Sequence, residues 1–209
     1  MSREKDELRK RLRDGCVAGD FVYLPVGIQN DCQSPGDKPR IQPDILATLA
    51  AASTVFGYLA IPPEPEVLPL MKAALAAGAK VLVPRVVGND LEFAPLASTA
   101  GPFSTGPYGI REPLPGVRTA WPGRSLETPA VILVPALAFS KDGARLGRGK
   151  GYYDRFLASL LKEAGSRRNG ITIVGICRPE RVLEHVPTEP HDIPVDCLWT
   201  EKDGIFTVY

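Results

Sequence analysis

The sequence predicts an α/β fold, a three-layer sandwich in which helices cover both faces of a mostly parallel sheet. Apolar runs of strand length alternate with segments of helical periodicity along the chain, and this alternation is typical of parallel sheets with crossover helices. The most apolar run, residues 130–139, reads AVILVPALAF, as expected for a strand buried on both faces. The 209 residues show no internal repeat and no clear domain boundary, so we expect residues 1–209 to form a single domain.

Helices are expected where apolar residues recur at helical spacing between turn signals, at residues 3–13, 44–52, 66–77, 152–163 and, as a short helix, around 181–185. In the first of these segments Leu8 and Leu12 lie four positions apart among charged residues, which is the spacing of one helix face. In the third, Pro69 falls in the first turn, where proline is tolerated, and Gly78 ends the helix.

Strands are expected in apolar runs bounded by turn-forming residues, at residues 21–26, 54–61, 80–86, 130–139, 171–177 and 196–200. Residues 91–96 are a candidate for pairing with a neighbouring strand. Segments 27–40, 97–128 and 140–151 are rich in glycine, proline or polar turn formers, so no regular element is expected in them.

Charge and cysteine content exclude several classes of function. With 25 basic and 24 acidic residues the net charge is +1, so the chain as a whole has no electrostatic attraction to nucleic acid or anionic membranes. Its four cysteines include no C-x-x-C pair, which excludes a zinc ribbon or a thioredoxin-type motif. The N-terminal segment is charged and no run reaches the length of a membrane span, so we expect a cytoplasmic protein with reduced thiols.

The loop after the most apolar strand has the composition of a phosphate-binding site. Residues 140–156 read SKDGARLGRGKGYYDRF, with an excess of basic residues and alternating glycines at positions 147, 149 and 151. Glycine permits the positive φ angles that point successive N–H groups into one concavity, and the helix that follows adds its free N–H groups. The loop fits neither the Walker A pattern nor G-x-G-x-x-G. The alternative is a tight basic loop with a solvated face.

Acidic residues at three places have both a structural and a functional interpretation. Asp154, one turn into the helix after the loop, either compensates helix-end charge or binds Mg²⁺ beside phosphates. Glu64 and Glu66 follow a strand end; they either recognise N–H groups of a ligand or begin a helix, and the residues alone favour the helix. The acidic segment 184–196, which contains both histidines, either supplies a second carboxylate to a metal or forms a solvated turn.

The segment GARLGRGKGYYDRFL, residues 143–157, closely resembles the signature of the 5-formyltetrahydrofolate cyclo-ligase family, also called methenyltetrahydrofolate synthetases. Further resemblances follow the family's order: K-x-x-L-R from Lys5 to Arg9, the strand TVFGYLAI with Glu64 and Glu66, YGIREP at 108–113, and HDIPVD at 191–196 before Thr200 and Glu201. Three features depart from the family pattern: Val67 replaces a usual threonine, Ser140 a common aspartate, and 27–40 looks loop-like where members continue helical.

The resemblance implies a fold similar to the NagB/RpiA/CoA-transferase-like α/β sandwiches. It also implies the ATP- and Mg²⁺-dependent conversion of 5-formyltetrahydrofolate to 5,10-methenyltetrahydrofolate, ADP and phosphate. It assigns ATP binding to Lys5, Arg9, Arg145, Leu146, Gly147, Arg148, Gly149, Lys150, Gly151, Tyr152 and Tyr153. It assigns Mg²⁺ to Asp154 and Asp192, the reduced folate to Ile61, Glu66, Tyr108 and Tyr153, and catalytic roles to Arg145, Lys150 and Tyr153.

Two alternative functions stay open: a non-catalytic protein that binds 5-formyltetrahydrofolate, and a related enzyme that activates another amide or a carboxylate with ATP. Intact Arg145, Lys150 and Asp154 argue against the first alternative. Intact Tyr108 and Glu66 argue against the second, which the change at position 67 leaves open. We expect a monomer whose partners are ATP and the reduced folate, with no nucleic acid and no membrane.

Overall fold

A mostly parallel sheet forms the centre of the molecule. The computed structural model describes residues 3–13, 40–121, 126–202 and 205–208. Within these residues eight strands pair in the order β1–β13–β12–β10–β7–β2–β3–β4. Their bounds, in that order, are Arg40–Ile41, Ile205–Val208, Cys197–Lys202, Ile171–Cys177, Ala130–Pro135, Thr54–Phe56, Lys80–Val87 and Asp90–Pro95. Neighbours pair in parallel except β12 with β13 and β3 with β4, so the predicted α/β class is confirmed.

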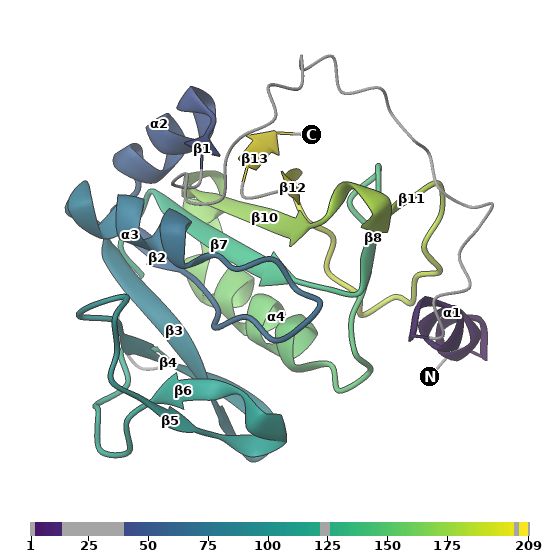
Figure 1. Ribbon diagram of the computed structural model, residues 1–209, viewed down its shortest axis with the longest axis horizontal. Helices are drawn as coiled ribbons and strands as arrows, with labels where there is room; N and C mark the ends of the chain where they lie inside the picture. Colours follow the sequence, from purple (N-terminus) through teal and green to yellow (C-terminus); the bar gives the residue numbers. More distant parts are fainter. Residues whose placement is uncertain (1–2, 14–39, 122–125, 203–204, 209) are drawn as a thin grey trace, which may run out of the picture.

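Helices cover both faces of this sheet, which makes three layers (Figure 1). The helices are α2, Pro43–Ala51, and α3, Leu68–Ala76, on one face, and α4, Tyr152–Ala164, on the other. Successive residues of β7 show the reason. Val131 and Leu133 pack in the cluster that contains the apolar side chains of α2 and α3, whereas Ile132 and Val134 pack with those of α4. A strand buried on both faces requires a continuous apolar run, and β7 has one.

A smaller sheet beside the first holds the N-terminal helix. Its strand order is β11–β8–β9, with bounds Val182–Leu183, Ala138–Ser140 and Arg145–Leu146. The helix predicted from the spacing of Leu8 and Leu12 is confirmed as α1, Arg3–Arg13. Leu12 packs in one cluster with Ala138 and Leu146, so α1 lies against the small sheet, next to the start of the glycine-rich loop (Figure 1).

The prediction of a strand at 54–61 extends too far, because the β-sheet pairing of β2 ends at Phe56. The N–H of Gly57 still donates to the carbonyl of Leu82 at 2.8 Å, and a Cβ at this glycine would lie 2.2 Å from Sδ of Met71 in α3. Beyond this close approach Tyr58 donates from its hydroxyl to the carbonyl of Pro65 at 3.0 Å. The segment therefore folds into a loop, and α3 begins at Leu68 instead of residue 66.

The strand predicted at 130–139 is two strands, β7 and β8, because the chain leaves the large sheet after Pro135. The predicted loop at 140–151 contains β9, which pairs antiparallel with β8. The short helix predicted around 181–185 is wrong, since a 3-10 turn at Pro179–Arg181 leads directly into β11, which pairs in parallel with β8. These three short strands depend on one another, and local periodicity does not reveal such pairing.

The glycine- and proline-rich segment 97–128 contains a small hairpin that the sequence does not predict. Its strands are β5, Phe103–Thr105, and β6, Arg111–Pro113, joined through a 3-10 turn at Pro107–Gly109. The pairing proposed for residues 91–96 is confirmed, because β4 runs antiparallel to β3. The strand predicted at 21–26 and residues 27–39 of the predicted loop lie outside the described residues.

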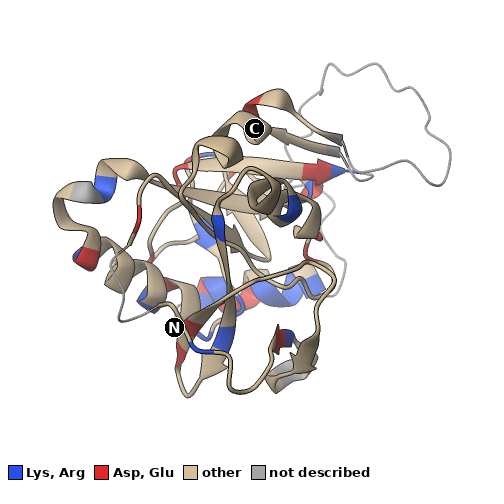
Figure 2. Ribbon diagram, turned by 90° about the vertical axis from the view of Figure 1, so that its left-hand side faces the viewer, with Lys and Arg blue, Asp and Glu red and all other residues tan. Residues whose placement is uncertain are grey.

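Basic and acidic segments are interspersed along the ribbon in Figure 2. This distribution agrees with the near-zero net charge of +1. Among the described residues, no helix combines the length and the apolar character that crossing a bilayer requires.

Candidate functional site

The glycine-rich loop, residues 147–151, joins β9 to the start of α4. Gly149 and Gly151 have φ angles of +93° and +66°, in the region that favours glycine over residues with a Cβ. Gly151 is the N-cap of α4 and supplies no side-chain hydrogen bond to the helix. The first N–H groups of α4 are therefore available to an anionic ligand, as at other helix N-termini that bind phosphate.

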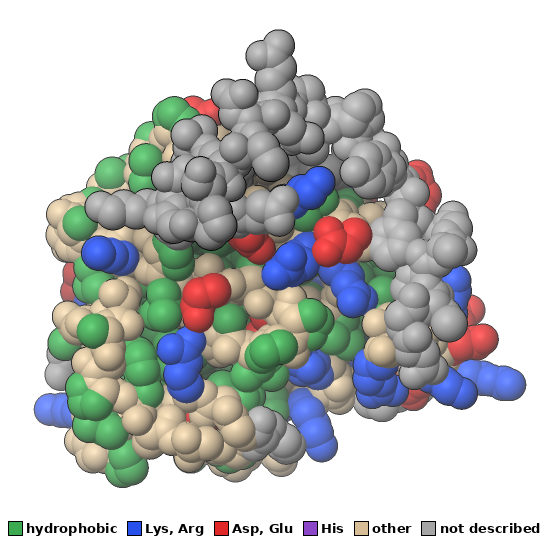
Figure 3. Space-filling view, in the orientation of Figure 1, with side chains coloured by type: hydrophobic (Ala, Val, Ile, Leu, Met, Phe, Trp, Pro, Cys, Tyr) green, Lys and Arg blue, Asp and Glu red, His purple; other side chains and the backbone are tan. Residues whose placement is uncertain are grey.

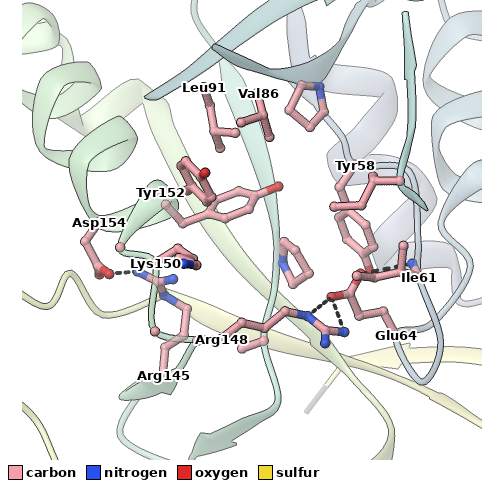
Figure 4. A pocket seen from close by; sticks show the side chains of 18 of the residues that line it. Tyr58, Ile61, Glu64, Val86, Leu91, Arg145, Arg148, Lys150, Tyr152 and Asp154 are labelled. Carbon is pink, nitrogen blue, oxygen red and sulfur yellow. Dashed lines mark hydrogen bonds and ion pairs between the residues drawn. The ribbon is translucent and has the colours of Figure 1, made fainter. Parts of the chain in front are cut away.

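The loop forms one wall of a cavity of about 440 Å³. Polar lining residues come from α1, from the segment after β2, from β6, from β9 with the glycine-rich loop and the start of α4, and from the acidic segment near the C-terminus. They are Lys5, Arg9, Glu64, Glu112, Arg145, Arg148, Lys150, Tyr152, Tyr153, Asp154, Glu189, His191 and Asp192. Apolar lining residues are Leu59, Ile61, Pro84, Val86, Leu91, Ile110, Pro135 and Ala136. Charged side chains of both signs stand among hydrophobic ones in the middle of the face shown in Figure 3. The cavity therefore combines a charged side with an apolar side (Figure 4).

Helix α1 brings two buried cations to the loop, Lys5 and Arg9, which are 3% and 7% exposed. Arg9 donates from Nε to the carbonyl of Gly147 at 2.9 Å and from Nη1 to Asp6 at 2.6 Å. Lys5 Nζ lies 3.0 Å from Oε2 of Glu189 and also contacts Oδ2 of Asp192. Both positions that the resemblance assigns to ATP at the N-terminus thus lie at the cavity.

The ion pairs of Lys5 shift the protonation of all three partners. Burial alone would lower the pKa of Lys5, but hydrogen bonds to Asp192 and Glu189 outweigh it and raise the pKa. Burial would raise the pKa of Asp192, whereas the hydrogen bond from Lys5 brings it below its ordinary value. The same ammonium group lowers the pKa of Glu189. At neutral pH the three groups are therefore charged.

Arg145, on β9 directly before the glycine-rich loop, is a third buried cation of the cavity. Its Nη2 pairs with Oδ1 of Asp154 in the first turn of α4. Its Nε is buried and has no hydrogen-bond partner among the described residues. The hydroxyl of Tyr153 is likewise buried without a partner there, and burial raises the pKa of this phenol above its ordinary value. Two unsatisfied buried donors next to a cavity indicate a ligand that accepts hydrogen bonds.

The acidic segment near the C-terminus supplies a group of metal-ligand type. Ligand atoms of Glu189, His191 and Asp192 lie within 4.8 Å of one another. Asp154 lies beside them, because its Oδ1 accepts the N–H of Ile193 at 3.5 Å. The resemblance points to Asp154 and Asp192; Glu189 and His191 were not singled out, although the acidic composition of 184–196 was the available signal.

Only some of the residues that the resemblance assigns to the folate line the cavity. Ile61 and Tyr153 line the cavity. Glu66 does not: its carboxylate accepts Nη2 of Arg111 at 2.9 Å and the N–H of Leu68 at 3.1 Å. Tyr108 lies in the 3-10 turn before β6, and its side chain is not among those described. Leu146, assigned to ATP, is fully buried in the cluster under α1 and does not line the cavity.

The resemblance did not assign two carboxylates that line the cavity, Glu112 and Glu64. Glu112 is 6% exposed and accepts the N–H of Val86 at 3.0 Å, which ties β6 to β3. Glu64 accepts the N–H of Ile61 at 3.2 Å and pairs with Arg148. Glu64 stood beside Glu66 as a candidate, but the sequence does not show which of the two turns inward.

Comparisons with known proteins point to one family. A model of the 5-formyltetrahydrofolate cyclo-ligase family matches residues 40–201. The 5-formyltetrahydrofolate cyclo-ligase of Mycolicibacterium smegmatis is 37% identical over 158 residues, which are 73% of this chain and 75% of that protein. Two solved methenyltetrahydrofolate synthetases are similar in fold. The one from Aquifex aeolicus has a TM-score of 0.57 and 27% identity, covering 95% of this chain and 90% of its own. The one from Mycoplasma pneumoniae has a TM-score of 0.55 and 21% identity, covering 93% and 97%. Because the family model matches residues 40–201, which are most of its 209 residues, this chain belongs to the 5-formyltetrahydrofolate cyclo-ligase family.

Proposed function

We propose that this protein converts 5-formyltetrahydrofolate and ATP, with Mg²⁺, into 5,10-methenyltetrahydrofolate, ADP and phosphate. The observation that carries the proposal is the convergence of the glycine-rich loop, the buried cations of α1 and the carboxylates of 189–192 on one cavity. That cavity also has an apolar side formed by residues after β2 and on β3 and β4. A triphosphate requires the charged side, and a flat heteroaromatic ring requires the apolar one.

The residues present fit a magnesium ion beside phosphates. Asp192, Glu189 and Asp154 offer carboxylate oxygens, the ligands that Mg²⁺ prefers, and Mg²⁺ usually takes only one or two of them from protein. These carboxylates are now neutralised by Lys5 and Arg145. A Mg²⁺ ion bound to the carboxylates would free the ammonium group of Lys5 and the guanidinium group of Arg145 to bind phosphate oxygens. Binding of the metal would thus prepare the site for the triphosphate.

The chemistry to be supplied is activation of an amide. A formamide carbonyl is a poor electrophile, and transfer of the γ-phosphoryl group of ATP to the formyl oxygen converts that oxygen into a leaving group. The N10 nitrogen of the same substrate then attacks the formyl carbon, and phosphate departs. Nothing in this route needs a protein nucleophile, which agrees with the raised pKa of about 12 for the buried thiol of Cys177.

Three side chains of the loop region have the properties this route needs. Arg145 and Lys150 carry positive charge at the wall of the cavity, on the side that we assign to the phosphates, and such fixed charge stabilises phosphoryl-transfer transition states. Tyr153 stays protonated because burial raises the pKa of its phenol. Its hydroxyl, which lacks a partner among the described residues, is therefore a hydrogen-bond donor for an oxygen of the bound substrates.

The test is the absorbance of the methenyl product after the protein is mixed with 5-formyltetrahydrofolate and MgATP. Product should appear in the complete mixture only, and not when ATP is omitted or when Mg²⁺ is chelated. Binding of the folate without product would indicate the non-catalytic folate-binding protein. Release of ADP with other amides or carboxylates, but not with this folate, would indicate the related activating enzyme.

Three wider features belong to the same proposal. The expected monomeric state stays a prediction. The specific NagB/RpiA/CoA-transferase-like class and a cytoplasmic location stay predictions.

A further inference from the structure

Arg155, in the first turn of α4, contacts a different acceptor with each nitrogen of its guanidinium group. Nη1 donates to the carbonyl of Lys150 in the glycine-rich loop at 3.0 Å. Nη2 donates to the carbonyl of Asn89, and Nε donates to Oδ1 of Asp90 at 3.1 Å. Asn89 lies in the turn between β3 and β4, and Asp90 is the first residue of β4. One planar group therefore joins the glycine-rich loop to the β3–β4 turn.

The guanidinium group of Arg155 lies outside the cavity. Arg155 is not one of the lining residues, whereas Lys150 and Tyr152 are. Its Cζ lies 5.4 Å from the ring centroid of Tyr152, which is within the range of a cation–π contact. Figure 4 shows Tyr152 between Lys150 and the wall that contains Val86 and Leu91. Arg155 can therefore act on the cavity only through the loop residues that it contacts.

The loop depends on contacts from outside for its conformation, because glycine restricts the backbone less than any other residue. At the start of the loop, Nε of Arg9 donates to the carbonyl of Gly147 at 2.9 Å. At its end, Arg155 contacts the carbonyl of Lys150. A Cβ at Gly151 would lie 2.9 Å from Nη1 of Arg155, so this glycine leaves room for the contact. Arg9 and Arg155 thus hold the two ends of the loop.

The β3–β4 turn is the firmer of the two segments that Arg155 joins. The antiparallel pairing of β3 with β4 extends from Leu82–Pro95 to Val87–Asp90, so regular pairing reaches the turn itself. The carboxylate of Asp90 is 71% exposed, and exposed ion pairs contribute little to stability. The backbone carbonyls therefore supply most of the attachment, and the loop is the segment expected to move when Arg155 is removed.

We propose that Arg155 is a positioning residue for ATP, which holds the carbonyl of Lys150 and the ring of Tyr152 where the triphosphate needs them. This proposal rests on the function proposed above. A loop that is ordered before its ligand arrives binds that ligand more tightly, because binding then costs less conformational entropy. A lysine at position 155 would keep the charge, but an ammonium group lacks the planar fork that reaches acceptors in two segments.

The experiment measures the Kd of a non-hydrolysable ATP analogue with Mg²⁺ by titration calorimetry. Arg155→Met keeps an apolar stem and should raise this Kd about tenfold, the effect of ordering one or two side chains on binding. The Kd of 5-formyltetrahydrofolate should change less than about twofold, because the pairing of β3 with β4 does not depend on Arg155. Arg155→Lys should remain about fivefold weaker or more, since the fork is still missing.

The matched control is Arg168→Gln. Arg168 also bonds to a carbonyl and a carboxylate, those of Ile171 and Asp196, at 2.7 and 2.6 Å, and it does not line the cavity. Its variant should bind the analogue like the unmodified protein. Thermal unfolding shows whether each variant is folded at the temperature of the titration.

A double variant separates positioning from a general effect on stability. If Arg155 acts through Lys150, then Arg155→Met and Lys150→Ala remove overlapping contributions. The double variant should therefore bind the analogue about 10–30-fold more weakly than the unmodified protein, whereas independent effects would multiply to about 100-fold.

The proposal is overturned by a fully multiplicative loss in the double variant or by normal analogue binding in Arg155→Met. Full recovery of binding in Arg155→Lys also overturns it, because only the charge would then matter; this variant decides the question even if Arg155→Met does not fold. Failure of the unmodified protein to bind the analogue at all would instead refute the proposed function, and the inference with it.

Discussion

The ammonium group of Lys5 contacts the carboxylate of Asp192, although 187 positions separate the two residues. The contact attaches the N-terminal helix to the acidic segment near the C-terminus. It also neutralises a proposed phosphate-binding cation with a proposed metal-binding carboxylate. The two charges thus satisfy each other, and the stability of the helix attachment depends on the ionisation of both groups.

This attachment predicts a loss of stability in acid. The pKa of Asp192 is lowered in the folded protein, so its contribution is present above the ordinary value near 3.9 and is lost as the pH falls through the folded value. The pKa of Lys5 is raised in the folded protein. Its contribution to stability is therefore lost only in alkaline solution, as the pH rises above the ordinary lysine value of about 10.4. Lys5→Met keeps the apolar stem and removes the charge. We expect its Tm to fall less than that of the unmodified protein between pH 6 and pH 3.

The measurement is thermal unfolding followed by circular dichroism over this pH range. Lys10→Met, at an exposed position of the same helix, is the matched control and should follow the unmodified protein. Identical acid profiles for Lys5→Met and the unmodified protein would show that the ion pair contributes nothing to stability.

Lys150 should bind the triphosphate. It is exposed, lines the cavity, and its backbone carbonyl accepts Nη1 of Arg155 at 3.0 Å, which fixes the loop where the side chain begins. Lys150→Ala should raise the Kd for ATP roughly tenfold, about 1.4 kcal/mol, while folate binding is nearly kept. Lys162→Ala, exposed on α4, is the control. An ATP titration of Lys150→Ala that matches the control would remove Lys150 from the site.

Local sequence signals predicted the elements that carry the loop. Leu8 and Leu12 fixed the apolar face of α1, and the glycines before Tyr152 marked the start of α4, because capping and periodicity act over a few residues. The continuous apolar run predicted β7 for the same reason. The position of Lys5 and Arg9 at the cavity came from the family resemblance and not from any local pattern.

Features that depend on distant pairing were not predictable in this way. The small sheet exists because β8 pairs with β9 on one side and β11 on the other, and each strand alone is too short to have a period. Which of Glu64 and Glu66 turns inward depends on the path of the chain after Gly57, and that path is set by contacts with α3 and β3.

Asp154 should control the need for Mg²⁺. Asp154→Asn keeps the shape and removes the charge, so the Mg²⁺ concentration for half-maximal rate should rise about tenfold. Asp90→Asn, which removes an exposed carboxylate bonded to Arg155, is the control and should keep the normal requirement. If Asp154 only compensates helix-end charge, the variant would lose about 0.3–1 kcal/mol of stability and keep its Mg²⁺ dependence.

The carboxylate of Glu66 forms an ion pair with Arg111 and does not line the cavity. Arg111 belongs to β6, which follows the turn containing Tyr108 and also contains Glu112 of the cavity wall. Its guanidinium also lies 5.5 Å from the ring centroid of Phe103 on β5. The Glu66–Arg111 pair thus holds the β5–β6 hairpin against the start of α3, and we expect Glu66 to affect the folate through the position of this hairpin.

Glu66→Gln should therefore raise the KM for 5-formyltetrahydrofolate while the KM for ATP barely moves. The pair is about half exposed, so a contribution of about 0.2–1 kcal/mol is expected, which corresponds to a change of at most about fivefold. Arg111→Gln should reproduce the effect, and the double variant should add little to either single change, because all three remove the same contact. Steady-state kinetics of the three variants decides the question. A large rise in Glu66→Gln with normal kinetics in Arg111→Gln would show instead that the Glu66 carboxylate meets the folate directly, as the resemblance implies.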